Sequence, residues 1–287
     1  MAAKDDRRAR FRAVLSGGRC VTAGSVWDPI SARVADRLGV EVGLMGGSLG
    51  SYAVLGAPDV IVLTLTEFAD QARRACRASR VALLVDADHG YGNALNVMRT
   101  VEELEAAGVA AMTIEDTLLP RAFGAGGKAQ LTSVEEGVGK MKAALAARRD
   151  PELVIVGRTS AHAITNVDEA VVRLKAYEAA GVDALMAPGI KTRADLDRIA
   201  GAVKLPLIVG GASAELADMT YLTARNVRVW SAGHQAFAAS VKAIYDTMKA
   251  AQASAAPNLS SQIADKELMD WVTRAAEFDA NARKYLD

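Results

Sequence analysis

Short apolar runs, each bounded by turn residues, recur along the chain with helix-length segments between them. We interpret eight of these runs as strands, at residues 20–23, 42–45, 82–85, 111–114, 153–157, 184–187, 207–209 and 227–231. They are continuous rather than alternating, which is typical of strands covered on both faces. Helical spacing of apolar side chains is clearest at residues 65–80, 95–107, 134–147, 167–180 and 195–203. Two of these helices run into Ala-Gly-Val, so we expect Gly108 and Gly181 to form their C-caps.

The alternation of strands and helices predicts an α/β fold whose parallel strands are joined by right-handed crossovers. Eight units are enough to close a barrel. The chain has 287 residues, and such a barrel typically takes about 250. We therefore predict a (β/α)8 TIM-type barrel over residues 1–250, with an open doubly wound sheet as the alternative.

Residues 251–287 are predicted to form a linker and a C-terminal helical tail. The linker is rich in Ala, and residues 266–286 have helical spacing. One stripe of that helix is apolar, formed by Leu268, Trp271, Val272, Ala275 and Phe278. An apolar stripe that remains after the barrel has closed favours docking on a neighbouring subunit. Packing across its own barrel is the alternative.

Composition narrows the class of protein. Lys plus Arg and Asp plus Glu both number 34, so no net positive charge favours nucleic acid or an anionic membrane surface. No apolar run approaches the ~20 residues of a membrane span, and the charged N-terminus lacks the apolar segment of a signal peptide. Cys20 and Cys76 are too few for a disulfide framework or a zinc set. We expect a cytoplasmic protein with a small-molecule partner.

Charged side chains gather where predicted strands end, which is where barrel enzymes carry their chemistry. Four carboxylates, one arginine and one histidine stand there: Asp86, Asp88, Glu115, Asp116, Arg158 and His234. We expect them to point at one mouth of the barrel.

Crowded carboxylates repel one another unless a cation offsets them. Mg²⁺ prefers oxygen ligands, uses few direct carboxylates and keeps several waters. We predict a Mg²⁺ site, with Mn²⁺ as a substitute, in which Asp86 is the direct ligand and Asp88 and Glu115 hold metal-bound waters. The alternative is that Asp88 caps the following turn and Glu115 pairs with a lysine.

Substrate-binding groups are predicted at three other strand ends. The guanidinium of Arg158 suits bidentate capture of a carboxylate, and Gly46, Gly47 and Ser48 offer main-chain N–H groups at close approach. His234 suits binding a carboxylate or moving a proton. The alternatives are a structural ion pair for Arg158, a tight turn at residues 46–48 and a structural histidine.

A long Gly-rich connection, residues 117–133, follows the fourth predicted strand. Its GAGGK sequence at residues 124–128 lacks the spacing and the Ser or Thr of a P-loop. A connection of this length is often an active-site lid. We predict a lid, with a plain loop as the alternative.

These residues together resemble the phosphoenolpyruvate mutase/isocitrate lyase superfamily. The matching motifs are GGS at 46–48, APD at 57–59, DADHGYGN at 86–93, IED at 114–116 and VGRTSA at 156–161. They follow the family order over almost the whole predicted barrel. The resemblance implies a barrel, Mg²⁺, an α-oxycarboxylate substrate and a tetramer whose final barrel helix swaps between neighbours.

Within that family the lid sequence is the most informative. It has no cysteine, unlike the lid of lyases that cleave isocitrate or methylisocitrate, and Thr117 stands where mutases carry a lysine. The TLLP lid and the segment around His234 most resemble the oxaloacetate decarboxylase branch. That resemblance implies that Ser48, Arg158 and His234 contact substrate. The branch can also carry a tyrosine after the seventh strand, where this chain has Gly210 and Gly211.

The resulting hypothesis is Mg²⁺-dependent decarboxylation of oxaloacetate to pyruvate and CO₂ through a metal-stabilised enolate. Asp88, Arg158 and His234 are the predicted catalytic residues. One alternative is a carbon–carbon lyase acting on a 2-hydroxy di- or tricarboxylate, such as methylisocitrate or a substituted malate. Another is a non-catalytic metabolite-binding barrel. An aldolase is disfavoured because no lysine stands at a predicted strand end.

Overall fold

The computed structural model describes residues 6–124, 126–211, 213–254, 259 and 263–286. These residues fall into two compact units, Met1–Gly233 and His234–Asp287, which are described separately. The first unit holds every strand. Its strands are β1 Val21–Thr22, β2 Gly24–Ser25, β3 Val42–Met45, β4 Ala82–Asp86, β5 Ala111–Glu115, β6 Val154–Arg158, β7 Ala184–Met186, β8 Leu207–Gly210 and β9 Val227–Ser231.

These strands close into a barrel. They are all parallel, and their order is β1-β9-β8-β7-β6-β5-β4-β3-β2. Only Ala23 separates β1 from β2, so the two are halves of one strand, of which the first pairs with β9 and the second with β3. The predicted (β/α)8 barrel is confirmed, and the open sheet is wrong.

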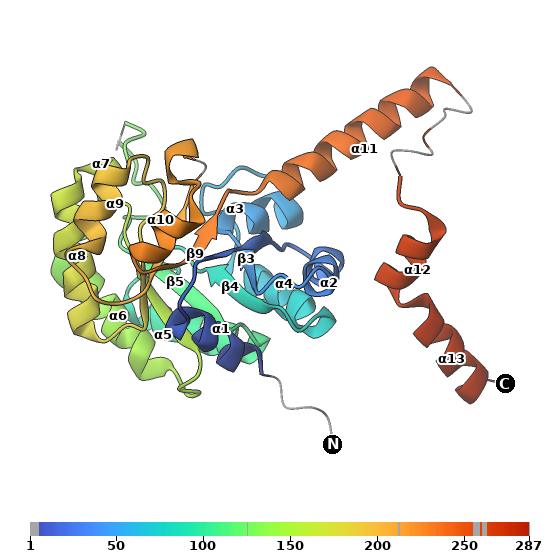
Figure 1. Cartoon of the computed structure of the whole chain (residues 1–287), viewed down its shortest axis with the longest axis horizontal. Coiled ribbons are helices and arrows are strands. Elements are labelled where there is room, and N and C mark those ends of the chain that lie inside the picture. Colours follow the sequence, from blue (N-terminus) through green and yellow to red (C-terminus); the bar gives the residue numbers. More distant parts are fainter. Residues whose placement is uncertain (1–5, 125, 212, 255–258, 260–262, 287) are drawn as a thin grey trace. The chain divides into compact units, whose positions relative to one another are not determined.

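Helices surround the strands of this unit (Figure 1). They are α1 Arg7–Ser16, α2 Pro29–Arg37, α3 Gly47–Gly50, α4 Leu65–Ala78, α5 Ala94–Ala107, α6 Val134–Ala147, α7 Ala161–Ile164, α8 Val167–Ala180, α9 Arg193–Ala200 and α10 Met219–Ala224, with a π-helical turn η1 at Ser51–Leu55 and a 3₁₀ turn η2 at Ala214–Leu216. The predicted caps are confirmed, since Gly108 and Gly181 follow α5 and α8 with φ of 90° and 97°. Only glycine adopts such angles readily.

The core has two layers because side chains alternate along each strand. In β5, Met112 and Ile114 pack toward the helices, whereas Ala111 belongs to the cluster inside the barrel. Phe11 and Leu15 of α1 are buried in the same inner cluster. Helix α1, which the sequence patterns did not predict, therefore plugs the end of the barrel where the strands begin (Figure 1).

The second unit contains α11 Gln235–Ala253, α12 Lys266–Thr273 and α13 Ala275–Tyr285. The helical stretch predicted at 266–286 is thus two helices, which break at Arg274 with a φ of 63°. The compact units divide after Gly233, before α11. The predicted domain boundary at residue 250 stays a prediction. Within the described ranges, every helix is too short or too polar to cross a membrane.

Candidate active site

Strand register brings the predicted charged residues together. Asp86, Glu115 and Arg158 are the last residues of β4, β5 and β6. Glu115 lies directly beside Arg158 in the ladder, and Asp86 pairs with Thr113. Each follows the inward-facing positions of its strand by two or four residues, so all three side chains point into the mouth of the barrel.

Arg158 lies between two carboxylates. Its Nη1 pairs with Asp86, and its Nε lies 3.1 Å from Oε2 of Glu115. Asp86 also accepts hydrogen bonds from the Thr113 hydroxyl at 2.9 Å and from the main-chain N–H of Asp88 at 3.2 Å. The structural ion pair that was the alternative for Arg158 is present, with Glu115 as its partner, and it lies within the predicted site.

Burial and charge set the ionisation of this cluster. Burial opposes the charged form of Asp86, but Arg158 and the hydrogen bonds from Thr113 and Asp88 bring its pKa below the usual value. Burial, Asp86 and further carboxylates raise the pKa of Asp88 well above normal, against the opposing effect of Arg158. Burial also raises the pKa of Glu115 despite Arg158. One guanidinium therefore does not offset the negative charge of this cluster.

The turn after β4 has an unusual backbone. Asp88 and Tyr91 have φ of 48° and 59°, and Gly90 and Gly92 also have positive φ. A non-glycine residue in this region is strained and is held there by its surroundings. Lys140 of α6 helps to hold this backbone conformation, because its buried ammonium donates to the main-chain oxygen of His89 at 3.0 Å.

The predicted residues after β3 lie against this turn. Gly46 precedes α3, and Gly47 and Ser48 open it. A Cβ atom on Gly47 would stand 2.7 Å from Oδ1 of Asp88, so only glycine lets the Asp88 carboxylate approach this closely. Gly47 and Asp88 are thus brought together.

A cavity of about 400 Å³ opens at this cluster. Its polar lining includes Asp88, Glu115 and Arg158, together with Asp59, which sequence reasoning did not place in the site. Its remaining lining is Val60, Ile61, Thr117, Leu119, Pro120, Arg121, Ala129, Ser160 and Ile164. Five of these residues come from the connection 117–133, which forms one wall.

Asp59 was missed because it follows no strand. It lies between η1 and α4, two residues before Ile61, whose φ of 62° is strained for a β-branched residue. Burial raises the pKa of Asp59, and the charge of Asp86 raises it further. The APD motif at residues 57–59 was the signal that could have placed it in the site.

One expectation changes with the structure. Asp116 does not face the mouth. It is fully buried toward the helices, where it accepts hydrogen bonds from Arg173 and Tyr177. At Gly210 and Gly211, where the branch can carry a tyrosine, main chain lies close, since a Cβ on Gly211 would stand 3.3 Å from Cα of Gly189.

His234 opens the second unit as the residue before α11. It follows β9 in the chain, as predicted, and its role in the site stays a prediction.

The donor set suits a largely hydrated Mg²⁺. Among the described residues, no three His, Cys, Asp or Glu side chains are placed to enclose a metal ion. Mg²⁺ does not require such a cage, because it keeps several waters and takes one or two carboxylates directly. The buried oxygen Oε2 of Glu115 forms an ion pair with Nε of Arg158 at 3.1 Å but makes no hydrogen bond within the described chain. Excess negative charge and hard oxygen donors are therefore both present.

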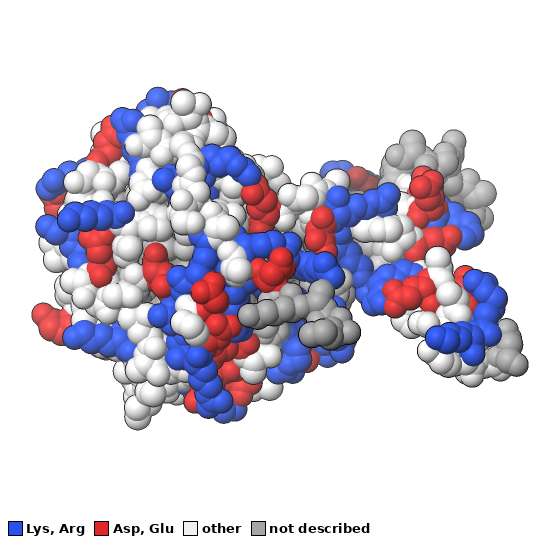
Figure 2. Space-filling model, turned by 60° about the horizontal axis from the view of Figure 1, so that its bottom comes forward, with Lys and Arg blue, Asp and Glu red and all other residues white. Residues whose placement is uncertain are grey.

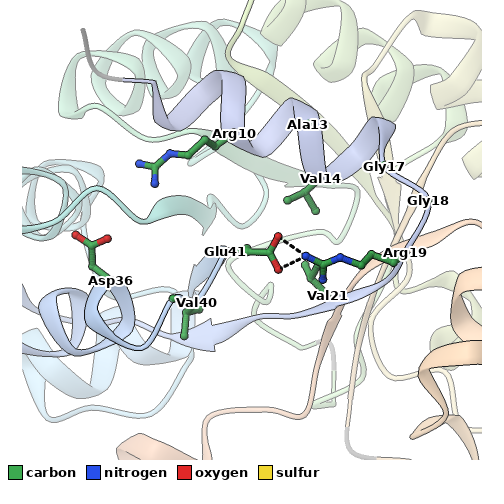
Figure 3. Close-up of a pocket in the computed structure, with 11 residues that line it drawn as sticks. Arg10, Ala13, Val14, Gly17, Gly18, Arg19, Val21, Asp36, Val40 and Glu41 are labelled. Atoms are coloured by element: carbon green, nitrogen blue, oxygen red, sulfur yellow. Dashed lines mark hydrogen bonds and ion pairs between the residues drawn. The ribbon is translucent and has the colours of Figure 1, made fainter. Parts of the chain in front are cut away.

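A second cavity, of about 580 Å³, lies where the strands begin. It is lined by α1, by residues 17–21 and by residues 36–41. Arg19 and Glu41 pair across it (Figure 3), and Arg10 pairs with Asp6. Because its charges partner one another at the end of the barrel that usually serves stability, we take the cavity at Arg158 as the candidate active site.

Comparisons with known proteins identify the family of the chain. The family model for phosphoenolpyruvate phosphomutase matches residues 11–252. This chain belongs to the phosphoenolpyruvate phosphomutase family. A curated relative from Rhodopseudomonas palustris (strain BisB18), named oxaloacetate decarboxylase, is 57% identical over 94% of this chain and 93% of its own.

Solved structures of the same family have the same fold. The phosphoenolpyruvate phosphomutase of Streptomyces platensis subsp. rosaceus has a TM-score of 0.90 and 29% identity, and the match covers 98% of this chain and 99% of that one. A phosphonopyruvate hydrolase in complex with oxalate and Mg²⁺ has a TM-score of 0.88 and 26% identity, with the same coverage.

Proposed function

We propose that this protein decarboxylates oxaloacetate to pyruvate and CO₂ in a Mg²⁺-dependent reaction at the Arg158 cavity. The observation that carries the proposal is the 57% identity, over nearly the whole chain, with a relative named oxaloacetate decarboxylase. The chemistry of the cavity is compatible with it, since a guanidinium and several carboxylates line a space of about 400 Å³.

Asp86 would hold the metal directly, and Asp88 and Glu115 would hold its waters. The relative crystallised with oxalate and Mg²⁺ supports this choice of cation, and Mn²⁺ offers the same preference for oxygen. When bound, the cation supplies a Lewis acid that stabilises negative charge on the keto oxygen as the carbon–carbon bond breaks.

Arg158 and the N–H groups of Gly47 and Ser48 would hold the carboxylate next to the keto group. Burial lowers the pKa of Arg158, but Asp86 and Glu115 outweigh that effect and keep the guanidinium charged at every physiological pH. The two carboxylates also fix the plane of the guanidinium, so its remaining N–H groups are oriented before substrate arrives.

His234 would position the carboxylate that departs. This carboxylate loses its charge as it becomes CO₂. Apolar surroundings favour that loss of charge more than water does, because they stabilise a carboxylate poorly. Ile61, Leu119, Pro120 and Ile164 provide an apolar wall in the cavity, and they would also exclude water.

The test measures the pyruvate formed from oxaloacetate by coupling the reduction of that pyruvate to the oxidation of NADH. The rate is compared in the presence of Mg²⁺, Mn²⁺ or EDTA. Free divalent ions also decarboxylate oxaloacetate, so an equal amount of the Asp86→Ala variant is the control. We expect rapid metal-dependent turnover by the wild type alone. Equal rates in the two proteins would overturn the proposal, as would cleavage of methylisocitrate or a substituted malate in place of oxaloacetate.

We also propose that the protein acts as a homotetramer in the cytoplasm, without nucleic-acid or membrane partners. Apolar side chains left exposed on the second unit support the assembly: Val241, Ile244, Tyr245 and Met248 of α11, and Phe278 of α13. Figure 2 shows positive and negative side chains interspersed on one face of the molecule, as expected for a protein with no basic binding surface there. Light scattering of the full chain, with an Ile244→Lys variant for comparison, tests the assembly.

A further inference from the structure

Helix α8 carries a row of polar side chains that face inward, behind the candidate active site. Glu169, Arg173 and Tyr177 are four residues apart and share one helix face. Arg173 is 6% exposed and Tyr177 is fully buried. A buried guanidinium is costly unless every part of it is paired, so its partners show what it stabilises.

Arg173 bonds to two segments at once. Its Nη1 donates to Oδ2 of Asp116 at 3.0 Å and to the main-chain oxygen of Thr132 at 2.9 Å. Its Nε donates to Oε1 of Glu169 at 2.7 Å, within its own helix. Asp116 and Thr132 are sixteen residues apart in the chain, so this single side chain joins the two ends of the connection between them.

That connection, residues 117–133, is called the lid segment from here on. Its two ends already form a narrow neck: the N–H of Thr132 donates to the oxygen of Asp116, and the N–H of Leu118 donates to the oxygen of Gln130, each at 2.8 Å. Thr117 and Leu131 form an antiparallel bridge between them. Arg173 closes the neck from the side of the helices.

The neck is directly connected to the active site. Asp116 follows Glu115, and the lid segment supplies one wall of the cavity through Leu119, Pro120 and Arg121. Tyr177 also holds Asp116 in place, because its hydroxyl donates to Oδ2 of Asp116 at 2.5 Å. Its side chain also packs against Gly157, where an added Cβ would stand 3.0 Å from Cβ of Tyr177. Gly157 immediately precedes Arg158.

We propose that Arg173 is a positioning residue for the reaction: it fixes the neck of the lid segment and thereby holds the cavity wall and Glu115 ready for substrate. Without it, the neck opens in a fraction of the molecules, and only the remaining fraction binds substrate. The apparent affinity for substrate falls in proportion to the fraction whose neck stays closed, while turnover of the bound complex is retained. The kinetic part of this inference rests on the proposed function, whereas the structural part does not.

The decisive variant is Arg173→Lys. Lysine keeps the positive charge that Asp116 needs, but its single ammonium does not reproduce the planar, three-way contact of the guanidinium. We expect KM for oxaloacetate to rise about tenfold, with kcat changed less than about threefold. Tyr177→Phe, which removes one hydroxyl from the same neck, should raise KM by a smaller factor.

Two matched variants separate the neck from general effects on the helix. Glu169→Gln removes the negative charge beside Arg173 within α8, keeps an oxygen that accepts from its Nε, and leaves both neck contacts in place. Arg198→Gln removes the ion pair with Asp168, which joins α9 to the start of α8 at an exposed position. Neither should change KM.

Tryptic cleavage gives a readout that needs no turnover. The lid segment contains Arg121 and Lys128, and cleavage of a native protein follows the population of the open form. We expect Arg173→Lys to be cut about tenfold faster at these two residues, with the rest of the barrel uncut and with Mg²⁺ plus oxalate slowing the cleavage.

Unchanged KM together with unchanged cleavage at Arg121 and Lys128 would overturn the inference. Cleavage that spreads over the whole chain at unchanged KM would also overturn it, since that pattern marks a residue that only stabilises the fold. Failure of the wild type to decarboxylate oxaloacetate overturns the proposed function instead, and the cleavage pattern still decides the role of Arg173.

Discussion

Arginine side chains occupy both ends of the barrel in two different chemical settings. Where the strands begin, Arg7 of α1 donates to the main-chain oxygens of Cys76, Ser79 and Gly108, at 2.9 to 3.2 Å. Where the strands end, Arg158 pairs with the carboxylates of Asp86 and Glu115.

The difference lies in what the partners are. These three oxygens belong to the C-terminal ends of α4 and α5, where helix dipoles favour a cation, and main-chain oxygens do not titrate. The carboxylates around Arg158 outnumber it, and their pKa values move in opposite directions. The first arrangement ties α1 to two helix ends and stabilises the fold. The second still attracts a cation and a charged substrate, so it suits catalysis.

The largest expected effect is at Arg158. Arg158→Lys keeps the charge but loses the bidentate, planar contact, and we expect kcat/KM to fall by about a hundredfold or more. Because the charge remains, the thermal midpoint should change little. Steady-state kinetics and calorimetry check both parts. Activity within threefold of the wild type would show that the two ends do not differ as described.

Arg7→Met should have the opposite signature. It removes several hydrogen bonds to main-chain oxygens that then stay buried, and we expect a loss of about 3 kcal/mol in the free energy of unfolding. The kinetic constants should stay at wild-type values at a temperature where the protein is folded. Urea denaturation and the decarboxylase assay measure the two quantities. A changed kcat would mean that the end of the barrel where the strands begin contributes to the reaction.

Two glycines, one near each end, give a smaller and more local comparison. In Gly47→Ala, the new methyl group would overlap the Asp88 carboxylate at 2.7 Å, and we expect about tenfold lower kcat/KM from the displacement. Gly18→Ala is the control, because nothing lies within 4 Å of its added Cβ and Gly18 lines the other cavity. Equal effects in the two variants would contradict this interpretation.

The smallest effect concerns Cys20, which precedes β1 at the end plugged by α1. Burial raises the pKa of its thiol from 9.0 to about 11, against the opposing charge of Arg228. The unfolded chain therefore loses this proton first, so stability falls as pH rises from about 9 to 11. Cys20→Ser should flatten that decline in denaturation curves. Rapid alkylation of native Cys20 at pH 8 would contradict the raised pKa.

Much of the molecule could be predicted from local patterns. Continuous apolar runs mark strands covered on both faces, and charged residues at their ends mark the mouth of the barrel, because closing parallel strands brings those ends together. Helix α1 was not predicted, since its arginines mask a short apolar face formed by Phe11 and Leu15. Asp59 was not placed in the site because the loop that brings it there has no periodic pattern.

The sequence by itself determined which residues stand at the strand ends and hence the kind of chemistry available: carboxylates, one guanidinium and glycines that permit close approach. The tertiary structure alone decided how neighbours such as Glu115 and Asp116 divide. Successive side chains point to opposite faces of a strand, so Glu115 enters the mouth of the barrel while Asp116 turns outward to Arg173. Only the strand register and the helices packed behind it distinguish two adjacent carboxylates that are chemically alike.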